Sequence, residues 1–274
     1  DANVTGVNST INYGNIASRA ESTNSAPFTF SLGAGANPGD LVKFYVDVFQ
    51  DGTVQTDRDS FYLTVGDRNV LFNDNAEGGT SNWSNGGSGT TWAVSTEDAY
   101  TGNTCFVDSQ LGHTASNNSR RFSLNSNISL ANTTNPRLEF AAKWGLYSTT
   151  DYVRLQISTN NGSSWSTITT SATENLSGSA AFVGNERWTH QSVDLSAYVG
   201  QSVRFRFVSF SNSSLRSDGF YFDDFRVVDY QDLPTCNDGI QNGSETGIDC
   251  GGPDCAACPT CEEGIQNGNE TGVD

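Results

Sequence analysis

The chain has 274 residues, of which 31 are acidic and 14 are basic, so its formal net charge is −17 at pH 7. This surplus of carboxylates excludes nucleic acids and anionic membrane surfaces as partners, since both require clustered Lys and Arg. It favours divalent cations, because carboxylate oxygens are the ligands that calcium prefers. With 28 glycines and only 16% charged residues, the composition predicts an all-β protein rich in turns.

The location of the protein is indicated by its cysteines and its apolar stretches. Five of the six cysteines fall in residues 236–261, and such a cluster in a polar segment indicates an oxidising, extracellular or cell-surface setting. No apolar stretch approaches the ~18 residues that a membrane-spanning helix needs, so we expect no membrane insertion. The absence of methionine leads us to expect a piece of a longer, processed protein.

Residues 1–66 carry short runs in which apolar and polar residues alternate. In residues 41–49 (LVKFYVDVF), every second residue from Val42 to Val48 is apolar. This period of two predicts a half-buried β-strand. Four or five such strands in this length predict a small immunoglobulin-like β-sandwich, with no site of its own.

Residues 67–230 contain eight or more strand-like runs separated by loops rich in Gly, Asn and Ser. Without a long helical period between them, these runs predict a two-sheet jelly roll. Residues 158–168 (STNNGSSWSTI) are expected to form a hairpin centred on Asn-Gly, with Trp165 packed over the turn. The spacing resembles an Asp-box hairpin, which we interpret as a folding device.

Five segments of this region resemble, in order, the jelly-roll domain of immune-inhibitor-A-like and MAM-like type. They are residues 71–84, 105–119, 138–165, 193–207 and 217–227. Such domains follow the catalytic domain in secreted bacterial metallopeptidases, notably zinc carboxypeptidases of Bacteroidetes. The resemblance implies a non-catalytic accessory or stalk region, which spaces the parent protein or attaches it to substrate or surface.

The resemblance also implies a calcium ion that ties the first strand of the jelly roll to the last. Its ligands would be Asp74, Glu77, Asp108, and Asp223 or Asp224. Strict alternation places Phe222 and Asp224 on one face of the last strand. It places Asp223 and Phe225 on the other, so one carboxylate points to the packed side and needs a partner or a cation. The alternative is that these acids are solvated at the rim of the fold.

The residues do not predict an enzyme. His113 and His190 are the only histidines, and neither belongs to an H-x-x-E or H-E-x-x-H zinc motif. His190 lies in a strand-like run, where we expect a structural role. Glu77 and Asp224 could be imagined as a glycosidase pair, but the calcium hypothesis uses the same acids. Any zinc carboxypeptidase chemistry would belong to the parent protein.

A carbohydrate- or surface-binding adhesin module is the alternative function. Jelly rolls can bind sugars through exposed aromatic rings. Trp83 and Trp92 flank the Gly-rich residues 84–91 and are therefore expected to be exposed and to bind ligand. Trp144 and Trp165 are expected to pack in the core or hairpin. In either function, the partners would be calcium and a cell-surface glycan or protein; a third hypothesis is a stalk whose repeats act as a spacer.

Residues 231–274 carry nine acids, no Lys or Arg, and a repeat of 25 residues that begins at Cys236 and again at Cys261. The second copy breaks off at Asp274, so we expect a longer array. The segment resembles Cys-rich acidic repeats that lead to a C-terminal type IX secretion signal. No such signal is visible here, so a partnership with that secretion machinery would depend on further sequence.

Three chemistries remain open for this tail. The C-x-x-C spacings could hold a metal through thiolates. Calcium could bind an EF-hand-like loop with the ligands Asp238, Asn242, Glu245 and Asp249. The first copy could instead close two disulfides, in any of three pairings, among Cys236, Cys250, Cys255 and Cys258. In each case little regular structure is expected, and Cys105 upstream is expected to be a buried free thiol.

Overall fold

The computed structural model describes most of the chain in atomic detail. The described residues are 4–8, 10–12, 16, 28–33, 35–50, 54–89, 91–110, 112–114, 117–147, 150–212, 217–231, 236–237, 239, 241, 245–253 and 255–258. Their regular structure is β-strand apart from one 3-10 turn, Ser196–Tyr198 (η1), which confirms the all-β prediction. In this part of the chain, no helix is long and apolar enough to cross a membrane.

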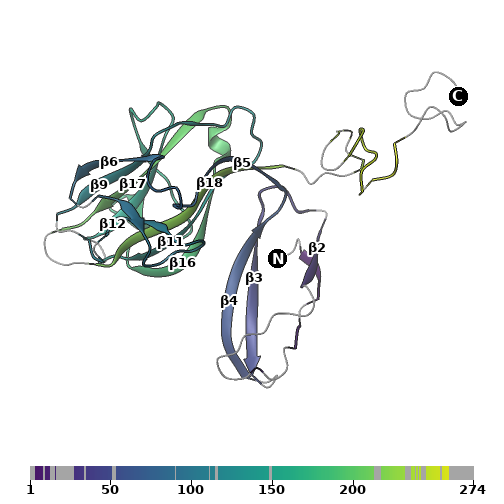
Figure 1. The fold of residues 1–274 in the computed structure, drawn as a ribbon, viewed down its shortest axis with the longest axis horizontal. Helices are drawn as coiled ribbons and strands as arrows, with labels where there is room; N and C mark the ends of the chain where they lie inside the picture. Colours follow the sequence, from purple (N-terminus) through teal and green to yellow (C-terminus); the bar gives the residue numbers. More distant parts are fainter. Residues whose placement is uncertain are drawn as a thin grey trace, which may run out of the picture. The chain divides into compact units, whose positions relative to one another are not determined.

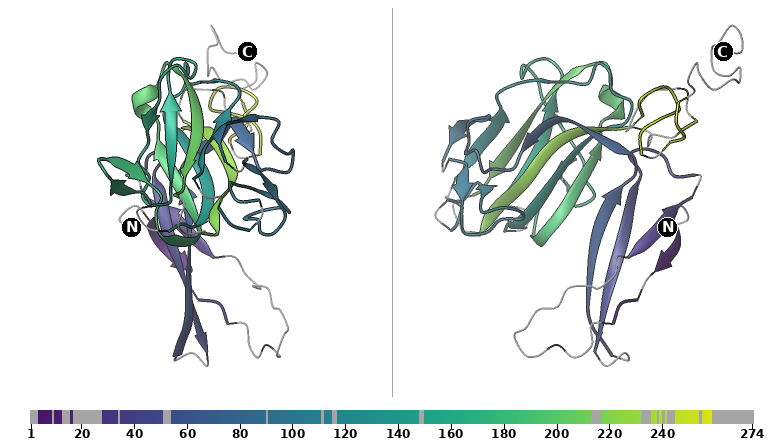
Figure 2. Two further views of the ribbon diagram at one scale, coloured as in Figure 1. Left: turned by 90° about the vertical axis from the view of Figure 1, so that its left-hand side faces the viewer. Right: turned by 45° about the vertical axis from the view of Figure 1, so that its right-hand side comes forward.

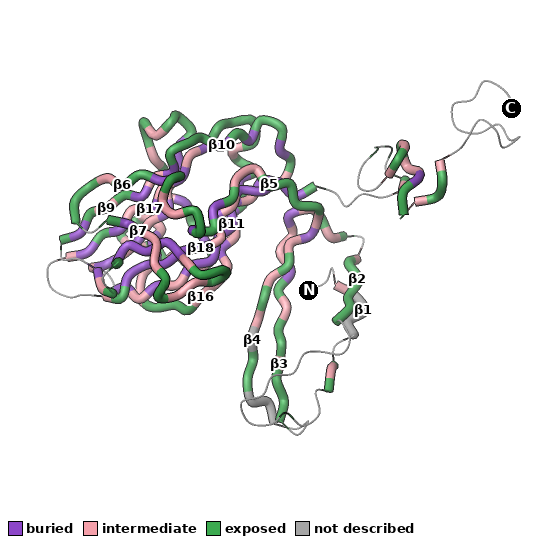
Figure 3. Tube along the Cα trace, viewed as in Figure 1, coloured by how far each residue is buried: buried purple, intermediate pink, exposed green. Residues whose placement is uncertain are grey.

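Contacts group residues 1–230 into one compact unit and residues 231–274 into a second, and each is described by itself. The boundary expected between residues 66 and 67 lies within the first unit and stays a prediction. Figure 3 shows that buried positions gather on the strands of residues 67–230. The hydrophobic core therefore belongs mainly to the predicted jelly-roll segment.

Two six-stranded sheets form this sandwich (Figure 1), and β11 (Pro136–Gly145), for example, runs antiparallel to both of its neighbours, β16 (Asn185–Asp194) and β18 (Gly219–Gln231). The first, called the β17 sheet, has the order β13-β12-β17-β9-β6, with β10 also paired to β17. Its strands are β6 (Trp83–Ser88), β9 (Ser119–Leu124), β10 (Ile128–Ser129), β12 (Tyr152–Ser158), β13 (Ser166–Thr167) and β17 (Ser202–Phe210).

The second, called the β18 sheet, has the order β16-β11-β18-β8-β7, with β5 also paired to β18. Its strands are β5 (Asp67–Asp74), β7 (Ala93–Ser95), β8 (Cys105–Val107), β11 (Pro136–Gly145), β16 (Asn185–Asp194) and β18 (Gly219–Gln231). A small hairpin, β14 (Glu174–Leu176) and β15 (Ser179–Ala181), stands beside them. Figure 2 shows the sandwich from two further sides, and its two layers confirm the predicted β-sandwich class.

Aromatic side chains from both sheets fill the space between the layers. Trp83 stacks on Phe122 with ring centroids 4.9 Å apart, and Trp92 stacks on the same Phe122 at 5.5 Å. Phe207 and Phe222 lie 4.3 Å apart across the core. Large aromatic groups bury much apolar area each, so this cluster is the main source of the sandwich's hydrophobic stabilisation.

The predicted exposure of Trp83 and Trp92 is wrong, because they are only 5% and 2% exposed. The Gly-rich residues between them are largely strand β6, paired with β9, rather than a surface loop. At Gly87 a Cβ would lie 2.1 Å from the carbonyl oxygen of Ser119, so close strand pairing requires glycine. Asn85 then receives the backbone N–H of Trp92 and donates to its carbonyl, which turns the indole inward.

The described part of residues 1–66 forms two two-stranded sheets. They are β1 (Val4–Asn8) with β2 (Thr29–Leu32), and β3 (Leu41–Gln50) with β4 (Val54–Thr64). Phe44 contacts Phe30 at 4.8 Å and Phe61 at 5.2 Å. On the apolar face of β3, Val42 is buried but Val46 and Val48 are exposed, so only part of that face is covered. The immunoglobulin-like topology stays a prediction.

In the second unit, disulfides join Cys236 to Cys255 and Cys250 to Cys258. This interleaved pairing confirms the disulfide hypothesis and selects one of the three connectivities. It also rules out thiolate metal binding by these four cysteines, because oxidised sulfur offers no thiolate. Regular pairing in the described part of this unit is one isolated bridge, Gly247 with Cys250.

Candidate functional site

The acids predicted to bind calcium are placed mainly as acceptors for backbone and side-chain donors. Asp74 is buried, and its Oδ1 accepts the N–H of Ala76 at 3.1 Å. Its Oδ2 accepts from Asn82 Nδ2 and Trp83 Nε1, both at 3.0 Å. Asp74 thus closes the turn after β5, which is a structural role for a buried carboxylate.

Glu77 and Asp108 accept hydrogen bonds from backbone groups at two other places in the fold. Glu77 Oε1 accepts the backbone N–H groups of Asn103 and Thr104 at 2.7 and 2.9 Å. These hydrogen bonds, led by the one from Asn103, lower the pKa of Glu77. Asp108 is buried and accepts the N–H of Phe220 at 2.9 Å, while burial raises its pKa to about 6.

The strict alternation expected along β18 is wrong at the paired aspartates. Asp224 has a positive φ of 49°, and the register with β11 shifts between Glu139 and Ala141, which marks a β-bulge. The bulge inserts one residue, so Phe222 and Phe225 both enter the core instead of facing opposite sides. Sequence periodicity could not reveal this irregularity.

The bulge turns Asp223 towards the segment before β8. Its Oδ2 accepts the backbone N–H groups of Tyr100 and Thr101 at 3.0 and 3.1 Å. Thr101 also donates its hydroxyl to Asp224 Oδ1 at 2.9 Å. Asp223 is fully buried, and burial raises its pKa. With Glu77, these two aspartates hold residues 100–104 from both ends.

Among the described residues, the five predicted calcium acids form no group of three whose ligand atoms lie within 4.8 Å of one another. The group that meets this criterion is Cys236, Glu245 and Cys255, whose two sulfurs already form a disulfide. For the repeat ligands, Asp249 accepts the N–H of Gly239 with both oxygens. Asp238 and Asn242 lie outside the described residues. Calcium therefore stays a prediction for the repeat, as it does for the jelly-roll acids.

A pocket of about 420 Å³ opens on the outer face of the β18 sheet, beside the end of β4 and the start of β5. The residues that line it include Tyr62, Tyr100, His190, Asp224, Arg226 and Tyr230. The volume lies in the range of sites for small ligands, and the lining combines aromatic rings with polar groups, as such sites require. We therefore take this pocket as the candidate functional site.

A buried ion pair underlies one wall of the pocket. Glu139 is 1% exposed, and its Oε2 accepts from Arg226 Nε at 2.8 Å. Its Oε1 accepts from the hydroxyls of Tyr230 at 2.8 Å and Thr64 at 3.2 Å. Burial opposes ionisation, but the charge of Arg226 and these hydrogen bonds lower the pKa of Glu139 overall. Glu139 is therefore ionised at neutral pH and fixes the orientation of Arg226 and Tyr230.

His190 lies opposite this ion pair and meets the hairpin β3–β4. Its ring is 6.1 Å from that of Tyr62, with the two planes 29° apart. Burial lowers the pKa of His190, so the imidazole is neutral at pH 7. Among the described residues its Nδ1 has no hydrogen-bond partner. That nitrogen is itself buried, so only the partly exposed remainder of the ring faces the pocket.

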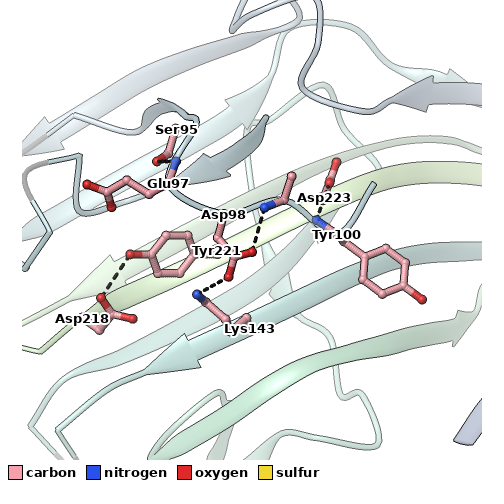
Figure 4. Close-up of polar contacts among 9 residues, drawn as sticks. Ser95, Glu97, Asp98, Tyr100, Lys143, Asp218, Tyr221 and Asp223 are labelled. Carbon is pink, nitrogen blue, oxygen red and sulfur yellow. Dashed lines mark hydrogen bonds and ion pairs between the residues drawn. The ribbon is translucent and has the colours of Figure 1, made fainter. Parts of the chain in front are cut away.

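Tyr100, which lines the pocket, also lies beside a second cluster of polar and aromatic side chains on the same sheet (Figure 4). Lys143 Nζ lies 2.6 Å from Asp98 Oδ2 and 4.4 Å from the ring centroid of Tyr221. Trp188 lies 5.9 Å from the Tyr100 ring, which is 47% exposed. The hydrogen bond from Lys143 lowers the pKa of Asp98. Together these groups extend the aromatic and polar surface along the same face.

Sequence reasoning missed this arrangement, although one signal for it was present. Tyr100 is an aromatic residue in the polar stretch STEDAYTGNT, and large aromatic side chains rarely lie in such a loop without a contact to make. His190 and Arg226 are polar members of alternating strands, and nothing local distinguishes them. Cys105 is buried and free as expected, with burial raising the pKa of its thiol to about 12. Trp144 and Trp165 also lie where predicted, in the core and the hairpin.

No protein-family model matches the sequence, and no curated protein matches it. Solved structures that resemble it include carbohydrate-binding modules and an adhesin domain. TmCBM61 in complex with β-1,4-galactotriose is 14% identical over 56% of this chain and 92% of its own, with a TM-score of 0.37.

Two further structures resemble the chain to a similar degree. The K3 cleaved adhesin domain of Lys-gingipain from Porphyromonas gingivalis w83 is 14% identical over 58% of this chain and 99% of its own, with a TM-score of 0.38. The CBM22-1 xylan-binding domain of Paenibacillus barcinonensis Xyn10C is 17% identical over 62% and 97%, with a TM-score of 0.37. At these TM-scores the likeness carries no argument about the site.

Proposed function

We propose that the unit of residues 1–230 is a non-catalytic carbohydrate-binding module of an extracellular or cell-surface protein, formed by the sandwich of residues 67–230 together with the end of β4. The pocket on the outer face of the β18 sheet carries this proposal. Its lining combines three tyrosines and a neutral histidine with Arg226, which the ion pair with Glu139 holds in place. This is the alternative function left open by the sequence. An accessory role in a secreted metallopeptidase concerns the parent protein and stays a prediction, as does a type IX secretion route.

The chemistry of the pocket suits a sugar. The C–H faces of a pyranose pack against aromatic rings, and its hydroxyls exchange hydrogen bonds with charged and neutral polar groups. Tyr100 offers an exposed ring for the first interaction. Arg226, held by Glu139, and the partly exposed imidazole of His190 offer polar groups for the second. Little ordering is needed on binding, because Arg226 is already held in place.

The test is titration of the full chain with neutral oligosaccharides selected by a glycan array. Replacing Tyr100→Ala or His190→Ala is expected to weaken binding about tenfold, the effect of losing one good contact of ~1.4 kcal/mol. Tyr147→Ala is the matched control, because Tyr147 is equally exposed but does not line the pocket. Silence across all neutral glycans, or an equal loss in Tyr147→Ala, would refute the proposal.

Calcium is a second element of the proposed function. Glu77, Asp223 and Asp224 hold residues 100–104, which carry Tyr100 into the pocket. We propose that calcium near these acids stabilises that segment, because a divalent cation would relieve the cost of burying Asp223. Chelation of divalent ions should then lower the melting temperature of the full chain and weaken glycan binding. An unchanged melting temperature on chelation and on readdition of calcium would contradict this.

A further inference from the structure

The opposite face of the sandwich carries a groove of a different kind. It is about 260 Å³ in volume and lies on the outer face of the β17 sheet. Residues that line it include Arg121, Arg204, Arg206, Trp165, Asn85 and Ser123. No acidic residue is among those that line it, all of which belong to the described part of the chain. Three arginines therefore meet in a protein whose net charge is −17.

Strand alternation brings the three arginines to one face. In β17, Val203, Phe205 and Phe207 enter the core, so Arg204 and Arg206 point outward. The neighbouring strand β9 pairs Ser123 with Arg206, which places Arg121 diagonally across from it on the same side.

The guanidinium groups of Arg206 and Arg204 are held in place by an aromatic ring and by hydrogen bonds. Arg206 lies 4.2 Å from the ring centroid of Trp165 and donates from Nε to Gln156 Oε1 at 2.7 Å. Trp165 is fixed in turn by a 2.9 Å hydrogen bond from Nε1 to the carbonyl of Gly162. Arg204 uses its Nε to bind the carbonyl of Leu124. In both arginines Nε therefore donates a hydrogen bond within the protein. Their terminal nitrogens can donate to a ligand in the groove.

The charges of this groove are not compensated within the described residues. The ion pairs found there are Arg58–Asp47, Lys143–Asp98 and Arg226–Glu139, so none involves Arg121, Arg204 or Arg206. Burial, followed by repulsion from Arg121, lowers the pKa of Arg206 to about 10. Clustered like charges disfavour folding, and a bound anion would remove that cost.

We propose that this groove binds an acidic polysaccharide, whose carboxylate or sulfate groups are held by Arg121, Arg204 and Arg206. Arginine forks match the planar oxygens of such groups. The hydroxyls of Ser84 and Ser123, which pair across β6 and β9, can serve the neighbouring sugar hydroxyls. A DNA duplex or an anionic membrane would extend past the groove over the rest of a chain whose net charge is −17, whereas one polysaccharide chain can stay within it. The site lies on the other sheet and does not depend on the proposed neutral-sugar pocket.

The test uses the full chain and two polyanions, polygalacturonate for carboxylates and heparin for sulfates, with neutral galactan for comparison. Calorimetric titration should show binding of at least one polyanion that weakens at high salt. Arg121→Gln is the first variant, because no hydrogen bond or ion pair with a described residue is lost with it. We expect about a tenfold loss of affinity for Arg121→Gln and again for Arg206→Gln, since a hydrogen bond to a charged group contributes ~1.5–3 kcal/mol.

Arg187→Gln is the matched control, because it removes the same charge from an exposed position on β16 of the other sheet. It should bind like the wild type, and Tyr100→Ala should also leave polyanion binding unchanged. Melting curves of each variant separate loss of the site from loss of the fold. Failure of both polyanions to bind, an equal loss in Arg187→Gln, or tighter Arg-dependent binding of duplex DNA or anionic vesicles would overturn the proposal.

Discussion

The two outer faces of the sandwich differ in how their charges are balanced. On the β18 sheet, Arg226 pairs with Glu139 and Lys143 with Asp98. On the β17 sheet, three arginines share one groove, and within the described residues none has a carboxylate partner. Paired charges are neutralised internally and make a rigid polar wall, whereas unpaired charges attract a counter-ion from outside. Two faces with the same strand pattern are therefore suited to different ligands.

The largest expected effect comes from the core that both faces share. Trp83→Ala should lower the free energy of unfolding by about 3–5 kcal/mol, because it removes a large aromatic group packed on Phe122 and leaves a cavity. Denaturant unfolding measures this, with Trp165→Ala as the comparison. A Trp83→Ala protein of normal stability that no longer binds glycan would mean that Trp83 contacts ligand.

The next prediction concerns the ion pair that distinguishes the β18 face. Glu139→Gln should cost about 1–3 kcal/mol of stability, since it leaves Arg226 partly buried without its counter-charge. Asp47→Asn, which breaks the exposed pair with Arg58, should cost clearly less, because water and salt screen an exposed pair. Denaturant unfolding of both variants tests the contrast, and equal costs would show that the buried pair has no special weight.

Lowering the pH should affect the ion pair of the β18 face and ligand binding on the β17 face differently, without any mutation. The pKa of Glu139 is lowered in the folded state, so its contribution to stability is present above the ordinary carboxyl pKa and is lost as pH falls through its folded pKa. Arginines stay charged over this range, and sulfate esters do too. Heparin binding should therefore persist at acidic pH, while polygalacturonate binding declines as its carboxylates take up protons. Parallel loss of both ligands, with the fold intact by circular dichroism, would contradict the arginine groove.

The smallest expected effect concerns the orientation of Arg206. Trp165→Ala should weaken polyanion binding roughly two- to fivefold, because Arg206 keeps its charge but loses the ring that positions it, a cation–π contact of ~0.5–1 kcal/mol. Trp165→Phe should retain most of the affinity. Titration of the two variants with heparin compares them, and an identical loss in both would point to the indole N–H rather than to ring stacking.

Alternation along single strands was sufficient to predict much of this architecture. In β17 the inward Val203, Phe205 and Phe207 and the outward Arg204 and Arg206 follow from a period of two. The residues 158–168 hairpin also forms as predicted, with Trp165 over its turn. These features depend on neighbours within a few residues, so local sequence carries them.

Long-range features escaped prediction because they depend on partners far along the chain. The bulge at Asp224 reverses the facing of Phe225, and it exists only in register with β11. Trp83 and Trp92 are buried because Gly-rich β6 pairs closely with β9. The pairing of Cys236 with Cys255 was one of three possibilities, and only the folded tail selects it.

The sequence by itself determined that this protein is all-β and acidic, because composition and strand period are local properties, and it left disulfides as one of three chemistries for residues 231–274. Tertiary structure alone decided where its chemistry lies. Tyr100, His190 and Arg226 come from separate strands and loops, and Arg121 of β9 joins Arg204 and Arg206 of β17 only through strand pairing. A linear pattern reveals that Arg204 and Arg206 share a face, but it reveals neither complete set, since each is assembled by the order in which strands pair within a sheet.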